Sequence, residues 1–268
     1  MSGDELTPHR LSEADLAALD DLERRVVEVD GGRLKLEKAG LRDGGAEGVL
    51  SYDGDRLIGF AGIYVFGSRP EVAGAVDPSY RRRGVGSALL DSALRATSPE
   101  SVLLVVPAGS AAGEGFARAR GGTHDHAEHA LVLTDPPEAP KDPRTEVRVA
   151  RPDDAELVAK VLSAAFGNAV GSLSEEALVI EHDGVPVGTL RLTRDGDSVG
   201  IYGFAVTPER QGQGIGRDVL RLICRQELAA GAKRVALEVA VDNPHALRLY
   251  TSTGFVPIAG EDYWSMPA

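Results

Sequence analysis

Apolar residues follow strand and helix periods in turn along this chain, and one stretch shows both clearly. Residues 201–206, IYGFAV, have the β-branched and aromatic content of a strand. Pro208 ends that strand because proline cannot donate to a ladder. Glycine then occupies every second position of residues 211–216, QGQGIG, and a helical run, RDVLRLICRQELAAG, follows. The pattern predicts a strand, a glycine-rich turn and a helix in succession.

The predicted turn has the chemistry of an anion site. Glycines accept positive φ and let a ligand approach the backbone closely. The unpaired N–H groups and the dipole of the following helix favour an anion, usually a phosphate. No lysine follows the glycines, which excludes the Gly-Lys-Ser/Thr nucleotide loop, and Val219 replaces the third glycine of the dinucleotide fingerprint. For the glycines alone, a tight turn without a ligand is an equal alternative.

A second pattern follows the first. Residues 235–241, VALEVAV, alternate between large and small or polar side chains, which indicates a strand with two distinct faces. Asn243 at the N-cap and Pro244 at the first helical position then open a short helix. Gly254 gives this helix a C-terminal stop.

Together the two patterns resemble the acetyl-CoA signatures of the GNAT N-acetyltransferases. The first is Gln-x-x-Gly-x-Gly at residues 211–216, after a strand that ends in Val-x-Pro. The second is Asn-Pro-x-Ala-x-x-x-Tyr-x-x-x-Gly-Phe at residues 243–255. The resemblance implies acetyl-CoA as the acetyl donor and direct attack by an amine, without an acyl-enzyme. It also implies that Tyr250 is the general acid at the CoA sulfur, with a core aromatic residue as the alternative.

The resemblance further implies which residues contact the cofactor. The backbone of Phe204 and Val206 would pair with the pantetheine amides as if the cofactor extended the sheet. Asn243 is expected at the CoA arm, although helix capping explains it equally well. The complete expected set is Phe204, Val206, Gln211, Gly212, Gln213, Gly214, Ile215, Gly216, Arg217 and Asn243.

The identity of the general base stays open at this point. Glu238 lies on the strand face opposite the large valines and could receive a proton directly or through water. A solvated glutamate is an equally good interpretation. Some GNAT proteins carry a glutamate on the strand before the phosphate loop, where this chain has Gly203.

The strand–turn–helix stretch at residues 201–231 has a second copy earlier in the chain. EVAGAVDPSYRRRGVGSALLDSALRAT, from residue 71, repeats the order strand, proline, glycine turn and helix. Five residues recur 130 positions later with the same identity, which argues for duplication of a whole domain: Val76, Pro78, Gly84, Gly86 and Leu90. Strands alternating with helices predict an α/β fold of two tandem GNAT-like domains. Each is expected to be a mixed, mostly antiparallel sheet flanked by helices.

The expected boundaries are residues 1–134 for the first domain, 135–145 for a proline-rich linker and 146–268 for the second domain. The first copy retains an anion loop at residues 81–86, RRRGVG. However, Ala117 stands where the second copy has Tyr250, and no Asn-Pro opens its last helix. We therefore expect a catalytic second domain and a catalytically silent first domain.

Composition limits the possible partners. A formal net charge of −12 gives little electrostatic support for nucleic-acid binding and weakly favours a cationic substrate. No apolar run has the length of a membrane span, and no signal-peptide pattern opens the chain. The single cysteine, Cys224, is expected to be a buried thiol, which fits a cytoplasmic protein. His124, His126 and His129 suggest a metal, but a polar strand is the better interpretation.

The sequence therefore predicts an acetyl-CoA-dependent N-acetyltransferase that acts on a primary amine of a small molecule or peptide. The alternative from another class is a non-catalytic acyl-CoA-binding or sensing protein, against which Tyr250 and Asn243 argue. We expect no metal, no nucleic acid and no membrane partner. The acetyl acceptor and the oligomeric state are open.

Overall fold

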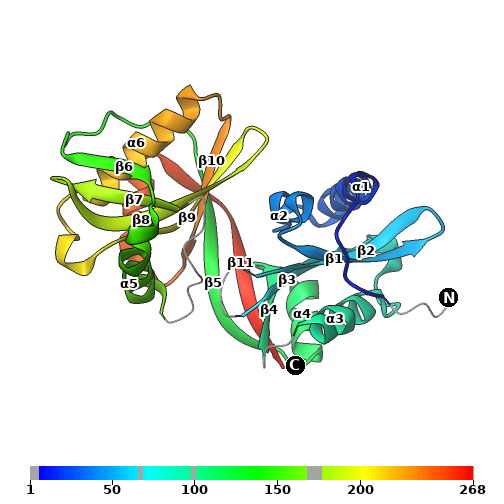
Figure 1. Ribbon diagram of the computed structural model, residues 1–268. Coiled ribbons are helices and arrows are strands. Elements are labelled where there is room, and N and C mark those ends of the chain that lie inside the picture. The colour runs from blue at the N-terminus through cyan, green and yellow to red at the C-terminus, as the bar shows by residue number, and fades with distance from the viewer. Residues whose placement is uncertain (1–5, 66–68, 98–100, 168–176, 268) are drawn as a thin grey trace. The chain divides into compact units, whose positions relative to one another are not determined.

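The computed structural model describes residues 6–65, 69–97, 101–167 and 177–267, which form two compact units. Unit 1 comprises Met1–Ala127 with Ala259–Ala268, and unit 2 comprises Glu128–Ile258. Each unit combines a mixed, mostly antiparallel sheet with flanking helices (Figure 1). The prediction of an α/β fold with two tandem domains is confirmed.

The strands of unit 1 stand in the order β1-β2-β3-β4-β11, and only the pair β3–β4 is parallel. Helices α1 and α2 cover one face of this sheet, and α3 and α4 cover the other (Figure 1). The elements are α1 (Glu13–Asp30), α2 (Lys38–Asp43), β1 (Glu47–Asp53), β2 (Arg56–Tyr64), β3 (Glu71–Val76), the 3-10 turn η1 (Pro78–Tyr80), α3 (Val85–Ala96), β4 (Ser101–Pro107), α4 (Ala111–Ala119) and part of β11 (Phe255–Pro267).

Local sequence explains most of these elements. Ser12 caps α1 with a capping box, and the leucine stripe of α1 is buried, as its helical spacing predicts. The hairpin between β1 and β2 turns at Asp53–Arg56, around the Asp-Gly pair that favours such a turn. The sequence also suggests a short helix at residues 33–38, but residues 33–37 form neither helix nor strand. Leu34 and Leu36 pack on the core, and Lys35 between them is also buried, with its Nζ at the hydroxyl and over the ring of Tyr263.

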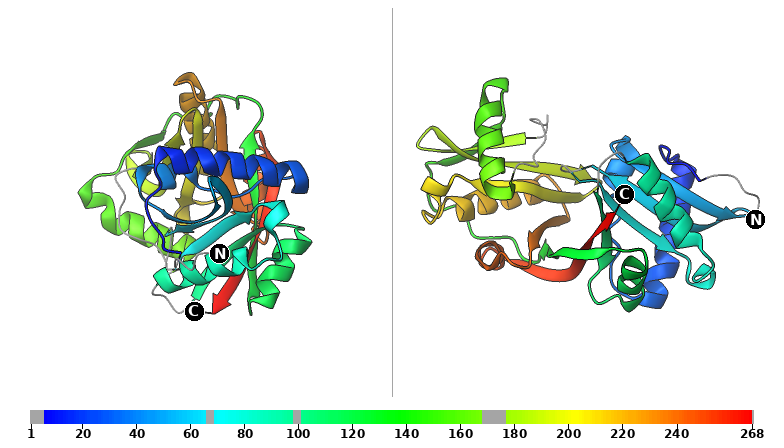
Figure 2. Two further views of the ribbon diagram at one scale, coloured as in Figure 1. Left: turned by 90° about the vertical axis from the view of Figure 1, so that its right-hand side faces the viewer. Right: turned by 90° about the horizontal axis from the view of Figure 1, so that it is seen from below.

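The strands of unit 2 stand in the order β5-β10-β9-β8-β7-β6, and only the pair β9–β10 is parallel. Helix α5 lies on one side of these strands, and α6 and α7 lie on the other (Figure 2). The elements are part of β5 (Thr123–Leu133), β6 (Thr145–Val149), η2 (Pro152–Asp154), α5 (Ala155–Phe166), β7 (Ala177–His182), β8 (Val185–Asp195), β9 (Ser198–Val206), η3 (Pro208–Arg210), α6 (Ile215–Ala229), β10 (Arg234–Ala240) and α7 (Pro244–Thr251).

The main core of unit 2 lies between the sheet and the pair α6–α7. Val235, Leu237 and Val239 point into it from β10, which confirms the two-faced strand expected from the sequence. Cys224 is buried in the same core, also as expected. Among the described residues, no helix has both the length and the apolarity that crossing a membrane requires.

The two units exchange strand segments along the chain. The last part of β11, Glu261–Pro267, pairs antiparallel with Ser101–Pro107 in unit 1. Residues 128–132 of β5 pair with β10 in unit 2. Each unit thus closes an otherwise exposed strand edge with a segment from the other half of the sequence. Boundaries drawn from the repeat do not include this exchange.

The exchanged strand β11 should be an integral part of the unit 1 core. Tyr263 is 1% exposed, so Tyr263→Ala should lower the free energy of unfolding of unit 1 by about 3–5 kcal/mol. Trp264, the only tryptophan, reports unfolding by fluorescence in a denaturant titration. Val256→Ala, at an exposed position of the same strand, is the control and should cost less than about 0.5 kcal/mol. Equal effects of the two changes would contradict this role for β11.

Candidate active site

A β-bulge in β9 sets the geometry of the candidate site. Thr189 of β8 pairs with Ala205, whereas Arg191 pairs with Tyr202, so two residues of β9 oppose one residue of β8. The first of the two is Gly203, whose φ of 56° lies in the left-handed region. A bulge that begins with a glycine in this conformation bends the strand and redirects the next side chain. Phe204 therefore packs towards the α6–α7 core.

The parallel pairing of β9 and β10 stops next to this bulge. Its register runs from Ser198↔Arg234 to Ile201↔Leu237, yet β9 continues to Val206 and β10 to Ala240. Each strand stays paired with its outer neighbour over the remaining residues. Beyond Ile201 and Leu237, the facing edges of the two strands are thus available to an extended ligand.

The glycine turn after β9 has the geometry of an anion cradle. Gly212 and Gly214 have φ of 75° and 86°, and Gly214 is the N-cap of α6. A Cβ atom added at either glycine would meet no atom within 4 Å, so their surroundings are open. Gln211 and Gln213 use their side-chain amides within the turn, donating to the carbonyl oxygens of Val206 (2.9 Å) and Glu209 (3.2 Å). The glutamines therefore shape the loop; the Gln211 N–H donates to Pro208, and the backbone amides of residues 212–216 could donate to an anion such as a phosphate.

Three further residues of the expected set have structural roles, through burial, close packing or helix capping. Ile215 is buried in the core, so only its backbone can face a ligand. Gly216 allows close packing of α6, because a Cβ atom there would lie 3.4 Å from Leu249 Cδ2 and 3.5 Å from Phe204 Cζ. Asn243 caps α7, accepting the Ala246 N–H at 3.0 Å through Oδ1. The capping interpretation of Asn243 is thus seen directly.

Tyr250 lies on α7 close to the point where β9 and β10 part. Its ring centroid is 6.4 Å from that of Phe204 and 6.2 Å from that of Phe255. Burial raises the pKa of the Tyr250 phenol to about 12. Within the described residues, its hydroxyl has no hydrogen-bond partner and is not sealed from solvent. The side chain is therefore a neutral donor at physiological pH with its proton available.

Glu238 and Tyr250 lie on opposite faces of the sheet. Tyr250 belongs to the core on the α6–α7 side, whereas Glu238 alternates with the core residues of β10 and shares its face with Ala130 of β5. On that same face, the Arg191 guanidinium lies over the Tyr202 ring at 5.5 Å. A reacting group held between β9 and β10 could therefore meet an acid from one face and a base from the other.

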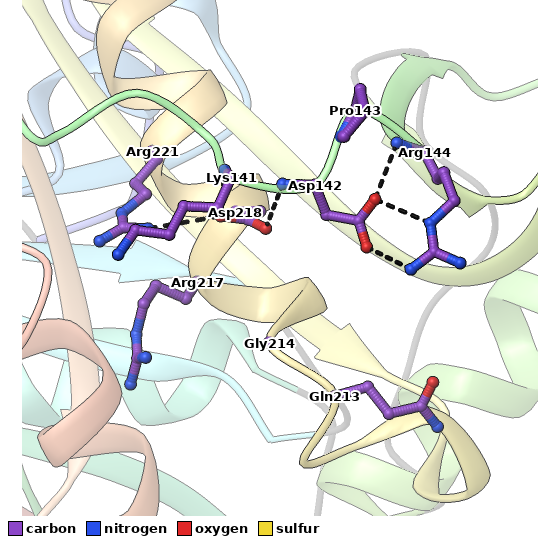
Figure 3. Close-up of a pocket in the computed structure, with 9 residues that line it drawn as sticks. All are labelled: Lys141, Asp142, Pro143, Arg144, Gln213, Gly214, Arg217, Asp218 and Arg221. Carbon is purple, nitrogen blue, oxygen red and sulfur yellow. Dashed lines mark hydrogen bonds and ion pairs between the residues drawn. The ribbon is translucent and has the colours of Figure 1, made fainter.

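Unit 2 also contains a pocket that the sequence did not predict. A pocket of about 390 Å³ opens beside the N-terminus of α6 (Figure 3). It combines the phosphate loop and first turns of α6 with the proline-rich segment between β5 and β6, and is lined by Lys141, Asp142, Pro143, Arg144, Gln213, Gly214, Arg217, Asp218 and Arg221. Of these, only Gln213, Gly214 and Arg217 were expected. The helical spacing of Asp218 and Arg221 was the available signal.

Unit 1 has the glycine loop and an early end of β3–β4 pairing, at Ala73↔Val105, but neither the bulge nor the tyrosine. Gly84 caps α3 with φ of 86° and ψ of −7°, against 86° and −9° at Gly214. However, β3 pairs with β2 without any register shift. The cavity where β3 leaves β4 measures only about 10 Å³, and Leu34 and Leu36 are among the side chains that line it. Ala117, at the position that corresponds to Tyr250, is buried and has no hydroxyl.

Other polar and aromatic candidates have structural partners. His124 contacts Asp262 and the edge of Trp264, and His126 stacks on Tyr263 at 4.2 Å. No cluster of metal-binding side chains occurs in the part of the chain that the structure describes. Tyr263 and Trp264 belong to the unit 1 core.

Comparison with known proteins finds acetyltransferase models that match both halves of the chain. Residues 145–255 match the model of the Acetyltransferase (GNAT) family, and residues 45–121 match that of the Acetyltransferase (GNAT) domain. A mycothiol acetyltransferase from Kytococcus sedentarius is 31% identical over 97% of both chains. One from Streptomyces coelicolor is 30% identical, over 94% of this chain and 90% of that protein.

Solved structures share the fold at lower identity. A GCN5-related N-acetyltransferase from Sphaerobacter thermophilus has a TM-score of 0.76 at 19% identity, covering 100% of this chain and 97% of that one. A tandem GNAT protein from the clavulanic acid biosynthesis pathway has a TM-score of 0.69 at 16% identity, covering 98% of both chains.

The raised pKa of Tyr250 should be measurable as a pH dependence of stability. Because the folded-state pKa of about 12 exceeds the ordinary value of 10, the phenol stabilises the fold fully below pH of about 10. That contribution is lost as the pH rises from about 10 towards 12. The difference in unfolding free energy between wild type and Tyr250→Phe should therefore shrink across this range. A difference that stays constant in denaturant titrations would contradict the buried phenol.

Proposed function

The chain belongs to the acetyltransferase (GNAT) family, and on that premise we propose that unit 2 transfers the acetyl group of acetyl-CoA to a primary amine of a small molecule. The observation that carries this proposal is the end of the β9–β10 register at Ile201 and Leu237. It lies between the glycine turn on one side and Tyr250 on the other. These are the elements that a long cofactor with a phosphate end and a thioester end requires.

Cofactor binding follows from the backbone. The pyrophosphate would accept hydrogen bonds from the amides of residues 211–216 at the N-terminus of α6. The pantetheine arm would then run along β9, where the backbone of Phe204 and Val206 would pair with its amides. This course leads the acetyl thioester into the space where β9 and β10 separate, next to Tyr250. The acetyl donor would supply the activated carbonyl.

Tyr250 would act as the general acid. When an amine attacks the thioester carbonyl, the sulfur leaves as a thiolate and needs a proton. A phenol with a pKa near 12 carries its proton at neutral pH, and its hydroxyl has no competing protein partner among the described residues. An interaction of this kind strengthens as the sulfur becomes negative, so it stabilises the transition state more than the ground state.

Glu238 is the candidate base, on the face opposite Tyr250. An amine is protonated in water at neutral pH and must lose a proton to attack. A carboxylate on the side from which the acceptor approaches could take that proton directly or through one water. Gly203 cannot be replaced by a glutamate without strain, because its φ is positive. The bulge therefore favours a base on a different strand from the one used by some family members.

The acceptor that the relatives' names suggest is a mycothiol-related amine. Two mycothiol acetyltransferases match most of this chain at about 30% identity. A small amine also agrees with the acidic net charge of −12, which favours cations near the surface. Product should be detected by mass, because this acceptor carries a thiol of its own. Cofactor binding with no acetylation in a broad amine screen would instead support a non-catalytic acyl-CoA sensor.

Matched glycine variants should distinguish the contributions of the two units to cofactor binding and turnover. Gly214→Val should weaken acetyl-CoA binding about 10-fold or more, since a β-branched residue resists the positive φ that the loop requires. Gly84→Val makes the same change at the same backbone geometry in unit 1 and should leave most turnover intact. Binding is measured by calorimetry and turnover by mass. Equal loss of activity in two folded variants would contradict a silent unit 1.

Tyr250→Phe should lower kcat by about 10²–10⁴-fold with little change in acetyl-CoA affinity. The substitution keeps the ring that contacts Phe204 and Phe255 and removes only the hydroxyl. Phe255→Leu in the same core is the control for a packing effect and should change kcat far less. Full turnover in Tyr250→Phe would return this residue to a structural role.

A further inference from the structure

The proline-rich segment between β5 and β6 is fastened along one face of α6. Asp218, Arg221 and Arg225 are spaced by three and four residues, which places them on the same side of the helix. Arg225 donates to the carbonyl of Pro137 at 3.1 Å, and Arg221 donates to Glu138 at 2.6 Å. The segment is therefore a strap held against the helix rather than a loose tether.

Asp218 positions the strap at the start of α6. Its carboxylate is buried and accepts the backbone N–H groups of Lys141 (2.9 Å) and Asp142 (3.1 Å). The Asp142 carboxylate in turn accepts hydrogen bonds from the Arg144 guanidinium. This contact lowers the pKa of Asp142. These contacts place Lys141 on one side of the pocket. Arg217 and the glycine loop form the other side (Figure 3).

The pocket carries an excess of positive charge. Its lining includes four basic residues and two acidic ones. Arg144 is occupied by Asp142 and Asp183, and Arg221 by Glu138 and Asp218. Their charges are thus largely compensated inside the protein.

The remaining two cations are available to a ligand. Arg217 has no ion pair among the described residues and is exposed at the pocket. Lys141 Nζ lies 3.7 Å from Glu138, and both side chains are more than 70% exposed, so this contact is weak. At the back of the pocket, Arg221 is more than nine-tenths buried, and its Nε has no hydrogen-bond partner. A buried N–H donor at the back, on a guanidinium whose charge is already compensated, and two available cations at the mouth suit a multiply charged anion.

We propose that this pocket binds the ribose 3′-phosphate of coenzyme A, with Arg217 and Lys141 as its contacts. The inference rests on the proposed function, because the loop amides of residues 211–216 are then occupied by the pyrophosphate. The 3′-phosphate is a separate monoester with a charge of about −2 at neutral pH. A pocket of about 390 Å³ next to the loop lies within the size range of small-ligand sites. The strap thereby makes unit 2 selective for the phosphorylated nucleotide.

The duplicated unit provides an internal comparison. Both copies keep the glycine loop with the same cap geometry. The positions that correspond to Arg217, Asp218 and Arg221 in α3 of unit 1 hold Ser87, Ala88 and Asp91. The loop of unit 1 carries arginines before its glycines, at residues 81–83, but its helix lacks the cation that corresponds to Arg217 and the residues that anchor a strap. The phosphate subsite belongs to unit 2 alone.

Binding of CoA and of dephospho-CoA, which lacks only the 3′-phosphate, tests this proposal by calorimetry on the full chain. Wild type should bind CoA about 10- to 100-fold more tightly than dephospho-CoA, the usual range for charge-assisted hydrogen bonds. Arg217→Ala should remove most of this preference by weakening CoA alone, and Lys141→Ala should remove part of it. Both residues are exposed, so neither change should affect folding. Lys233→Ala, which removes an exposed charge elsewhere in unit 2, should leave both affinities unchanged.

Each other outcome has a definite meaning. Equal binding of the two ligands by wild type would overturn the proposal while leaving the cofactor assignment in place. Arg217→Ala that weakened both ligands equally would place Arg217 at the pyrophosphate and would also overturn it. Absence of binding of either ligand would overturn the proposed function itself, and this subsite with it.

Discussion

The end of parallel pairing between β9 and β10 is the constraint on which the candidate site depends. Two neighbouring strands in a sheet normally satisfy each other's backbone groups along their whole length. Here Ile201 and Leu237 form the last register pair, and the bulge at Gly203 lies immediately beyond it. The bulge turns β9 away while β8 still holds its outer edge. The facing edges beyond this point are left for a ligand that can itself act as a strand.

The two units share the geometry of the glycine loop but differ in what surrounds it. Gly84 and Gly214 adopt nearly the same backbone angles at the starts of α3 and α6. Only unit 2 adds the bulge, the tyrosine on the following helix and the strap. In unit 1 the loop remains, but the unbulged strand leaves a cavity of about 10 Å³ with Leu34 and Leu36 at its wall. Under the proposed function, an anion site and a reaction site would be separable features of one fold.

Local sequence predicted the features that depend on local chemistry. The two strand–turn–helix stretches, the cap at Asn243 and the two faces of β10 follow from residue types and periods, and all are seen. The bulge was not predicted, because a single glycine within a strand does not distinguish a bulge from a regular strand. From the sequence, Gly203 stands out only as the position at which some GNAT proteins carry a glutamate.

Features that depend on distant partners were beyond sequence reasoning. The pairing of β11 with β4 joins residues about 160 positions apart, and nothing in either strand specifies the other. The strap was read as a linker because four prolines indicate an extended segment, whereas its anchors lie on a helix some 80 positions later.

A crystal structure of the full chain with CoA tests the central claim most directly. The account predicts the pantetheine arm between β9 and β10 beyond Ile201 and Leu237, the pyrophosphate on the amides at Gly214, and the sulfur near the Tyr250 hydroxyl. A complex in which β9 and β10 stay empty, with CoA bound elsewhere or only in unit 1, would contradict it.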